Sequence, residues 1–225
     1  MRHLSEKQKN LALIRVVDDD ETVRQALSVF FTMADWRVKT YADGPSFLAD
    51  FNPSVAGCAI LDIRMPEMSG IELHNEMLLR GITLPVIFLS AHGDIEMAVE
   101  AVHRGAKTFL VKPPQNDKLL AAVESAVLDD FDGRRQILYV NELRQQWESL
   151  TPAEKRVAVL IGKGLSNATT ASLLGVAERT VRGQRAAIYE KLDTENAVEL
   201  SDFLHELMLA HIPINSTESP TENEK

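Results

Sequence analysis

The first 128 residues alternate five times between a short apolar run and a segment of helical periodicity. The apolar runs cover residues 12–17, 38–41, 58–62, 86–90 and 108–111, and the helical segments cover residues 21–33, 45–50, 70–80, 95–104 and 117–128. Strands that alternate with helices in this way form a parallel sheet with helices on both faces. The runs are rich in β-branched residues, as strands buried on both sides require. We therefore predict an α/β fold, a five-stranded doubly wound parallel sheet, over residues 11–128.

The rest of the chain has helical patterns and no strand pattern. The fifth helical pattern ends near Asp130, a linking helix covers residues 134–147, and four helices follow over residues 153–162, 167–174, 179–192 and 197–209. The first of these four has a strong start signal, with Thr151 as N-cap, Pro152 at the first helical position and Glu154 completing a capping box. We predict a helical linker over residues 129–149, a smaller all-α domain over residues 150–211 and a disordered acidic tail over residues 212–225.

Composition excludes several classes of protein. The single cysteine, Cys58, cannot form an intramolecular disulfide and lies in an apolar run, which indicates a buried side chain. No apolar run approaches the ~18–20 residues of a membrane span, and the N-terminus lacks the apolar core of a signal peptide. We therefore expect a cytoplasmic protein with no membrane partner.

The net charge of -9 hides an uneven distribution of charge along the chain. Residues 1–130 carry 13 basic and 19 acidic side chains, whereas residues 155–191 carry seven basic and two acidic ones. From Asp193 to Glu224 every ionised side chain other than histidine is acidic. The basic segment is therefore bounded by negative sequence on both sides and is the part of the chain expected to meet nucleic acid.

Polar residues stand at the ends of four of the predicted strands. They are Asp18, Asp19 and Asp20 after the first, Asp62 at the third, Ser90 at the fourth and Lys112 after the fifth. In a doubly wound sheet these ends line the ligand crevice. Clustered carboxylates repel one another unless a cation neutralises them, and their oxygens suit Mg²⁺. A carboxylate beside Mg²⁺, with lysine and serine donors for phosphoryl oxygens, is suited to covalent transfer of a phosphoryl group to aspartate.

Simpler roles exist for the same residues. Asp20 and Glu21 also suit the N-terminal dipole of the helix that follows, and Asp18 and Asp19, taken singly, would serve equally well in that role. The compatible order of groups at four strand ends favours a shared site. Lys112 is followed by proline, so the bond between them is a candidate cis peptide.

A phosphatase is the enzymatic alternative. Asp18-x-Asp20-x-Thr22 after an apolar strand fits the nucleophile motif of haloacid dehalogenase-like phosphatases, with Asp18 as nucleophile. Ser90, Lys112 and residues 129–130 would then form the later motifs. Two features oppose it. Residues 129–130 end a helical segment rather than a strand, and the scheme gives Asp62 no role.

The second domain contains the spacing of a helix-turn-helix. Gly175, Val176 and Ala177 separate the helix over residues 167–174 from the helix over residues 179–192. The second helix buries an apolar stripe and leaves Thr180, Arg182, Gly183, Gln184 and Arg185 for DNA. The two arginines can bind guanine or phosphate. A glycine at position 183 lowers the stability of the helix by about 1 kcal/mol. Close approach of the helix backbone to DNA would offset this cost; the alternative is that the glycine is simply tolerated. A solvated basic helix in an ordinary bundle is the alternative.

The first domain resembles the receiver domain of two-component response regulators over almost all of residues 11–128. The resemblance lies in Val17-Asp18-Asp19-Asp20-Glu21, LDIRMPEMSG over residues 61–70, Ser90-Ala91-His92-Gly93-Asp94 and Val111-Lys112-Pro113. It implies a flavodoxin-like fold in which Asp62 accepts phosphate from the phosphohistidine of a sensor histidine kinase. It also implies a Mg²⁺ site formed by Asp18, Asp19, Asp62 and the backbone carbonyl of Arg64. By the same resemblance, Ser90 and Lys112 contact the phosphoryl oxygens. Phe109 is then either an aromatic switch or a plain core aromatic.

The second domain resembles the LuxR-type DNA-binding domain, so the whole chain is similar to the NarL/FixJ class of response regulators. The resemblance lies in LTPAE over residues 150–154, GLSN over residues 164–167, Thr180-Val181-Arg182 and Lys191-Leu192. It implies that each of two recognition helices in a dimer reads one half-site, and it adds Lys191 to the residues expected to contact DNA. The chain departs from the family pattern at Ala168, Thr169, Ala177 and Gln184. At Ala177 a helix cap is missing, at a cost of about 0.5–2 kcal/mol.

These expectations describe a phosphorylation-controlled transcription factor and not an enzyme. Phosphorylation of Asp62 would promote a homodimer whose paired domains bind double-stranded promoter DNA through avidity and act on RNA polymerase. A receiver that acts only through protein contacts, with a second domain that no longer binds DNA, is a further alternative.

Overall fold

The computed structural model describes residues 4–90, 99, 102–103 and 105–214. The chain divides into two compact units, Met1–Arg134 and Arg135–Lys225. Each unit has its own apolar core, so each is described by itself below.

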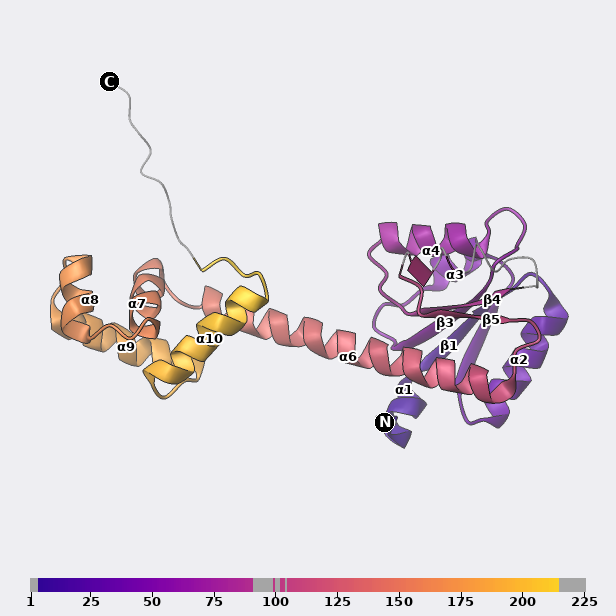
Figure 1. The fold of residues 1–225 in the computed structure, drawn as a ribbon, viewed down its shortest axis with the longest axis horizontal. Coiled ribbons are helices and arrows are strands. Elements are labelled where there is room, and N and C mark those ends of the chain that lie inside the picture. Colours follow the sequence, from indigo (N-terminus) through magenta and orange to yellow (C-terminus); the bar gives the residue numbers. More distant parts are fainter. Residues whose placement is uncertain (1–3, 91–98, 100–101, 104, 215–225) are drawn as a thin grey trace, which may run out of the picture. The chain divides into compact units, whose positions relative to one another are not determined.

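The first unit is built on a five-stranded parallel sheet (Figure 1). Its strands are β1 (Leu13–Val17), β2 (Arg37–Tyr41), β3 (Gly57–Asp62), β4 (Val86–Ser90) and β5 (Thr108–Val111). They are arranged in the order β2-β1-β3-β4-β5, and every neighbouring pair is parallel. This is the flavodoxin-like order, which confirms the predicted fold class.

Helices cover both faces of this sheet and enclose two cores. The helices are α1 (Glu6–Leu11), α2 (Glu21–Met33), α3 (Gly44–Asp50), α4 (Gly70–Leu79) and α6 (Asn116–Glu148). One core includes Phe47 of α3, Leu73 of α4 and Phe88 of β4, while the other includes Phe31 of α2 and Val123 of α6. The sheet residues alternate between the two cores because successive side chains of a strand point to opposite faces.

The first unit differs from the sequence expectations in two places. Helix α1 was not predicted, although Ser5 and Gln8 form a capping box at its start. Helix α6 is one continuous helix of 33 residues, where the helical patterns of the sequence covered residues 117–128 and 134–147 and left open whether the two segments are joined. Gly133 is the only helix-weakening residue there, and it costs about 1 kcal/mol, too little to end a helix with packed residues on both sides. The helix expected over residues 95–104 lies largely outside the described residues.

The second unit packs four helices around the end of α6. These are α7 (Pro152–Gly162), α8 (Asn167–Leu174), α9 (Glu178–Leu192) and α10 (Ala197–Leu209). Thr151 and Glu154 form the predicted capping box of α7. Ala177 provides no side-chain cap to α9, as expected from its methyl side chain.

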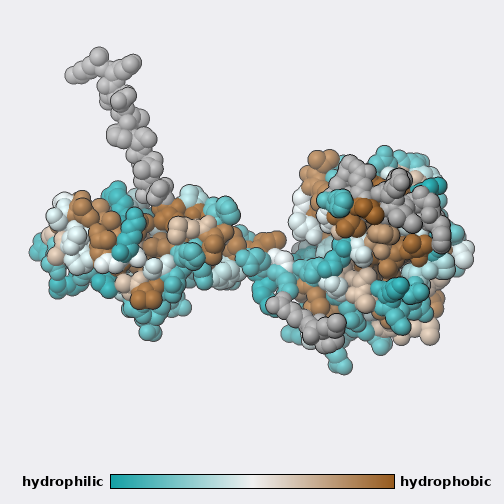
Figure 2. All heavy atoms as spheres, viewed as in Figure 1, coloured by the Kyte–Doolittle hydropathy of each residue, from teal (hydrophilic) through white to brown (hydrophobic). Residues whose placement is uncertain are grey.

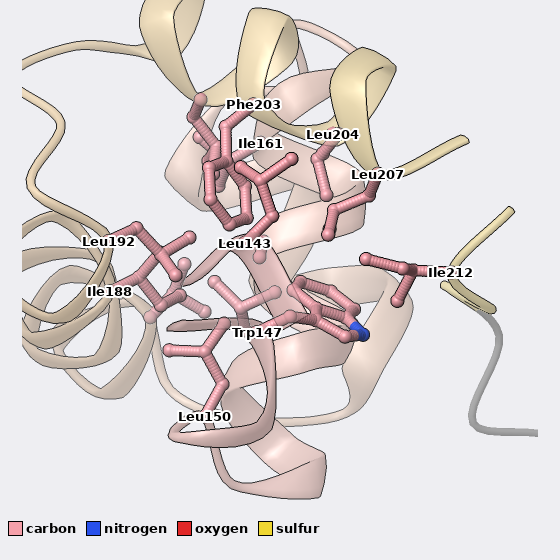
Figure 3. Packing of buried hydrophobic residues seen from close by; sticks show 14 of the residues in the cluster. Leu143, Trp147, Leu150, Ile161, Ile188, Leu192, Phe203, Leu204, Leu207 and Ile212 are labelled. Atoms are coloured by element: carbon pink, nitrogen blue, oxygen red, sulfur yellow. The ribbon is translucent and has the colours of Figure 1, made fainter. Parts of the chain in front are cut away.

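The core of the second unit includes residues outside 150–211, the range expected for the all-α domain. Leu143 and Trp147, in the expected linker, and Ile212, in the expected tail, are buried in this core. Figure 3 shows Leu143 and Trp147 of α6 reaching the same cluster as Phe203 of α10. The sequence pattern over residues 134–147 indicates a linking helix. In the structure, Leu143 and Trp147 of this segment form part of the core of the second unit. Residues 215–225 of the expected tail lie outside the described part of the chain.

The surface of each unit mixes hydrophilic and apolar residues. Figure 2 shows apolar side chains that reach the visible surface of both units in patches bordered by hydrophilic residues. In the described part of the chain, no helix combines the length and the apolar character needed to cross a membrane.

Candidate functional site

The strand order brings the predicted site residues to one edge of the sheet. Val17 of β1 is paired with Leu61 of β3. Asp18 follows Val17 and Asp62 follows Leu61, so the two aspartates are neighbours. Ser90, the last residue of β4, is paired with Val111, which precedes Lys112. Since all five strands are parallel, these carboxyl ends meet and form an acidic pocket.

Lys112 links the two buried carboxylates of the acidic pocket. Its Nζ lies 2.7 Å from Oδ2 of Asp18 and 2.5 Å from Oδ1 of Asp62. Asp18 is 1% exposed, Asp62 is 8% exposed and Asp19 is exposed. One carboxylate oxygen from each of these three aspartates lies within 4.8 Å of the others. Three carboxylates face one ammonium group, so the pocket retains negative charge for a cation.

The loop after β1 is held in place by its own hydrogen bonds. The backbone N–H of Asp20 donates to Oδ1 of Asp18 (3.0 Å), and the guanidinium of Arg24 on α2 donates to the Asp18 carbonyl (2.7 Å). The Asp20 carboxylate accepts a hydrogen bond from the N–H of Thr22 and caps α2. Asp20 therefore has the simpler capping role. Arg24 was not anticipated, because a basic residue in a helix carries no local signal that it will fold back on the preceding loop.

The loop after β3 approaches the phosphoacceptor candidate so closely that it requires a glycine. The N–H of Arg64 donates to Oδ2 of Asp62 (3.1 Å), and the N–H of Gly70 donates to the carbonyl of Ile63 (3.0 Å). A Cβ on Gly70 would lie 2.0 Å from the carbonyl oxygen of Asp62, far inside van der Waals contact. The glycine thus allows the capped start of α4 to pack against the end of β3. The Arg64 carbonyl remains a predicted ligand.

The charges of the acidic pocket shift the pKa values of its members. Burial raises the pKa of the Asp62 carboxyl above its ordinary value, and the neighbouring Asp18 carboxylate adds to the rise, although Lys112 opposes it. Burial alone would lower the pKa of Lys112, but hydrogen bonds to Asp18 and Asp62 outweigh it and raise the pKa. Lys112 therefore stays cationic, and Asp62 is a carboxylate held in a poorly solvated place where a cation would be bound favourably.

Ser90, at the end of β4, and Phe109, within β5, have different environments. Ser90 is fully buried, and its Oγ has no hydrogen-bond partner among the described residues. A buried hydroxyl without a partner is costly, and the predicted phosphoryl ligand would satisfy it. Phe109 is half-buried and packs against the core that contains Phe88. That position fits a core aromatic, and its role as a switch stays a prediction. The Lys112–Pro113 bond is cis, as expected.

The phosphatase alternative is not supported by the positions of residues 129–130. Asp130 accepts a hydrogen bond from the N–H of Gly57, the first residue of β3, and Asp129 pairs with Lys107, which precedes β5. Both aspartates therefore lie at the amino ends of the strands, opposite the acidic pocket. The motif that a phosphatase would form from residues 129–130 is separated from Asp18 by the length of the sheet.

The second unit presents several of the predicted DNA-contacting residues on α9. Thr180, Arg182 and Gly183 are exposed, and Gly183 has open space where a side chain would start. Gln184 is half-buried. The ion pair of Arg182 with Glu178, one turn earlier, is exposed and leaves the guanidinium accessible. A basic, accessible start of the second helix is what entry into a major groove requires.

Arg185 and Lys191 are held within the second unit. The guanidinium of Arg185 donates to Oδ1 of Asn167 on α8 (3.2 Å) and to the hydroxyl of Tyr189 (2.9 Å). Lys191 Nζ donates to both carboxylate oxygens of Glu154 on α7, at 2.9 and 2.8 Å. These bonds tie α9 to α8 and α7. The structure therefore gives Lys191 a structural partner, and its DNA contact, like those of Thr180, Arg182 and Gly183, stays a prediction.

The Glu154–Lys191 pair makes the second unit sensitive to acid. Burial would raise the pKa of Glu154, but hydrogen bonds from Lys191 and Thr151 outweigh it and hold the pKa below its ordinary value of 4.5. A depressed pKa contributes stability above the unfolded value, and this contribution is lost as the pH falls through the folded value. We expect the second unit to lose stability below pH 4.5, measured by thermal melting followed by circular dichroism.

Glu154→Gln and Glu190→Gln are the matched variants for this test. Glu154→Gln should be less stable at neutral pH and should lose less stability on acidification. Glu190, which is exposed on α9, should give a variant that behaves as the wild type. An identical acid dependence in Glu154→Gln and the wild type would assign the effect to other carboxyl groups.

Comparisons with known proteins match both units. The model of the response regulator receiver domain matches residues 14–124, and the model of the bacterial regulatory proteins of the luxR family matches residues 148–204. The response regulator protein TodT of Pseudomonas putida is 36% identical over 200 residues, which cover 89% of this chain and 87% of TodT. The tetrathionate response regulatory protein TtrR of Salmonella typhimurium is 35% identical over 212 residues, which cover 93% of this chain and 100% of TtrR. The solved structure of the response regulator StyR is 36% identical, with a TM-score of 0.82 over 87% of this chain and 98% of that chain.

Proposed function

The chain belongs to the NarL/FixJ-type response regulators, transcription factors that join a receiver domain to a LuxR-type DNA-binding domain, and we propose that phosphorylation of Asp62 controls it. The observation that carries this proposal is the convergence at one sheet edge of Asp62, Lys112 and the Ser90 hydroxyl, which has no hydrogen-bond partner within the described ranges. A nucleophile, a cation and a hydroxyl donor are the groups that transfer of a phosphoryl group requires.

The transfer uses the carboxylate of Asp62 as the nucleophile. A carboxylate oxygen forms a bond to phosphorus while the bond from phosphorus to the histidine nitrogen of a sensor histidine kinase breaks, and that nitrogen keeps the electron pair. Lys112 and Ser90 bind phosphoryl oxygens and stabilise their charge in the transition state. Asp62 needs no general base, because its carboxyl group reacts in the ionised form.

Mg²⁺ fits the acidic pocket through its donor set. The carboxylates of Asp18, Asp19 and Asp62 would hold the ion, with the backbone carbonyl of Arg64 as the further expected ligand. Hard oxygen ligands with excess negative charge are the chemistry that Mg²⁺ prefers. When bound, the ion neutralises the charge that otherwise repels an incoming phosphoryl group.

The second unit is proposed to bind promoter DNA as a homodimer. Phosphorylation favours a receiver state that dimerises, and two linked helix-turn-helix units bind two half-sites more tightly than one. Helix α9 enters the major groove, with Thr180, Arg182 and Gly183 nearest to DNA, and Gln184 and Arg185 behind them. Regulation of RNA polymerase follows from occupancy of the promoter.

Arg182→Ala tests the DNA interface. We expect binding to promoter fragments, measured by fluorescence anisotropy at fixed salt with acetyl phosphate and Mg²⁺ present, to weaken about tenfold, since one arginine contact is worth roughly 1–3 kcal/mol. The fold should be unaffected, because the ion pair of Arg182 with Glu178 is exposed and contributes about 0–1 kcal/mol.

Arg156→Ala is the control, because Arg156 is an exposed basic residue of α7, outside the recognition helix. Equal weakening in both variants would mean that only net charge matters and that α9 does not read the groove. If the wild type shows no salt-dependent DNA binding, the receiver acts only through protein contacts.

A further inference from the structure

A buried carboxylate far from the acidic pocket fastens α6 to the sheet. Asp130 is 5% exposed, and its Oδ2 accepts hydrogen bonds from the N–H of Gly57 and from Nε of Arg134, both at 2.8 Å. Gly57 begins β3, and Asp62 ends the same strand. The carboxylate of Asp130 thus holds the opposite end of the strand that carries the phosphoacceptor candidate.

Arg134 completes this connection one helical turn later. Its guanidinium donates to the carbonyls of Pro53 (2.5 Å) and Val55 (3.5 Å), in the segment between α3 and β3. The buried Arg15 of β1 also donates to the Val55 carbonyl (3.0 Å). We call the side chains of Asp130 and Arg134, with their bonds to residues 53–57, the α6 latch.

The helix has little support of its own immediately after the α6 latch. Residues 135–138 are all exposed, with Ile137 53% and Leu138 63% exposed, and we call them the α6 junction. Gly133 precedes them, with open space around it. Support from packed side chains resumes at Val140 and Leu143, in the core of the second unit. A short solvated helical stretch next to a glycine is marginal by itself, so its helicity depends on how its ends are held.

We propose that the α6 latch is a conformational gate for the α6 junction. While the latch is closed, the end of the receiver portion of α6 is fixed and the junction continues as helix. When the latch opens, residues 135–138 of the junction unwind. The gate therefore sets the helicity of residues 135–138 from the end of strand β3 opposite Asp62.

Hydrogen exchange of the full-length protein tests the gate. In Arg134→Ala we expect amide exchange of the α6 junction to rise about tenfold or more, because hydrogen bonds of a charged group are lost at the end of the receiver portion of α6. Exchange in β1, β3 and α7 to α10 should stay within a factor of about two of the wild type. Trypsin cleavage after Arg135 should accelerate in parallel.

Two further variants keep the test decisive. Arg134→Lys retains the charge but not the guanidinium geometry that reaches both carbonyls, so it should also accelerate junction exchange, and it serves if Arg134→Ala does not fold. Arg144→Ala, an exposed arginine later in α6, should behave as the wild type. The proposal is overturned if junction exchange is unchanged, if it rises equally throughout β1, β3 and α6, or if Arg144→Ala has the same effect. The experiment needs neither phosphorylation nor DNA, so its failure leaves the proposed function standing.

Discussion

Asp62→Asn is expected to abolish phosphorylation of the protein. Incubated with Mg²⁺ and acetyl phosphate, the wild type should gain the mass of one phosphoryl group, and the variant should gain none, because an amide oxygen is a poor nucleophile. The side chain of asparagine keeps an acceptor for Lys112 and removes a charge beside Asp18, so the fold should be retained. Intact-mass spectrometry checks the result, and circular dichroism checks the fold.

Two companion variants identify the role of each carboxylate. Asp117→Asn changes an exposed aspartate in the first turn of α6 and should be phosphorylated as the wild type is. Asp18→Asn should be phosphorylated much more slowly, because the pocket loses a buried oxygen ligand for the cation. A phosphoryl group on Asp62→Asn, together with turnover of a phosphomonoester that depends on Asp18, would instead support the phosphatase scheme.

The acidic pocket could be predicted from the sequence because its members are placed by strand ends. Periodicity located the strands, and a parallel sheet brings strand ends together whatever the intervening sequence. The alternation of five strands and helices was therefore enough to predict that Asp18, Asp62 and Lys112 lie at one edge of the sheet. The hydrogen bond from Arg24 to the Asp18 carbonyl depends on side-chain direction, which no pattern of residue types specifies.

The α6 latch and the extent of the second core could not be predicted, for a related reason. Asp130 and Arg134 bind backbone groups 73 to 81 residues away, in a loop without any distinctive motif. Residues 129–130 were interpreted as the end of a helix, since acidic residues after an apolar pattern usually mark a surface. The Asp130 carboxylate is in fact buried and paired with Arg134, Asp129 is exposed, and the helix continues through both residues.

Trp147→Ala is expected to destabilise the second unit by about 3–5 kcal/mol, the usual cost of removing a large buried aromatic side chain. Trp147 is 2% exposed and lies in the core with Leu143 and Ile212, although the sequence assigned it to a linker (Figure 3). Urea unfolding followed by circular dichroism should show the helical transition of the second unit at lower denaturant. The chain has two tryptophans, so the remaining one, Trp36, reports on the receiver by fluorescence.

The mirror-image variant makes this prediction specific to one unit. Trp36→Ala removes a tryptophan that is 4% exposed in the receiver core, so it should lower the receiver transition while Trp147 fluorescence reports an unchanged second unit. If residues 129–149 were only a connector, Trp147→Ala would alter neither transition by more than about 0.5 kcal/mol, as for a surface substitution. A large loss confined to the second unit would establish that the end of α6 belongs to the DNA-binding core, and that a fragment beginning at residue 150 lacks part of that core.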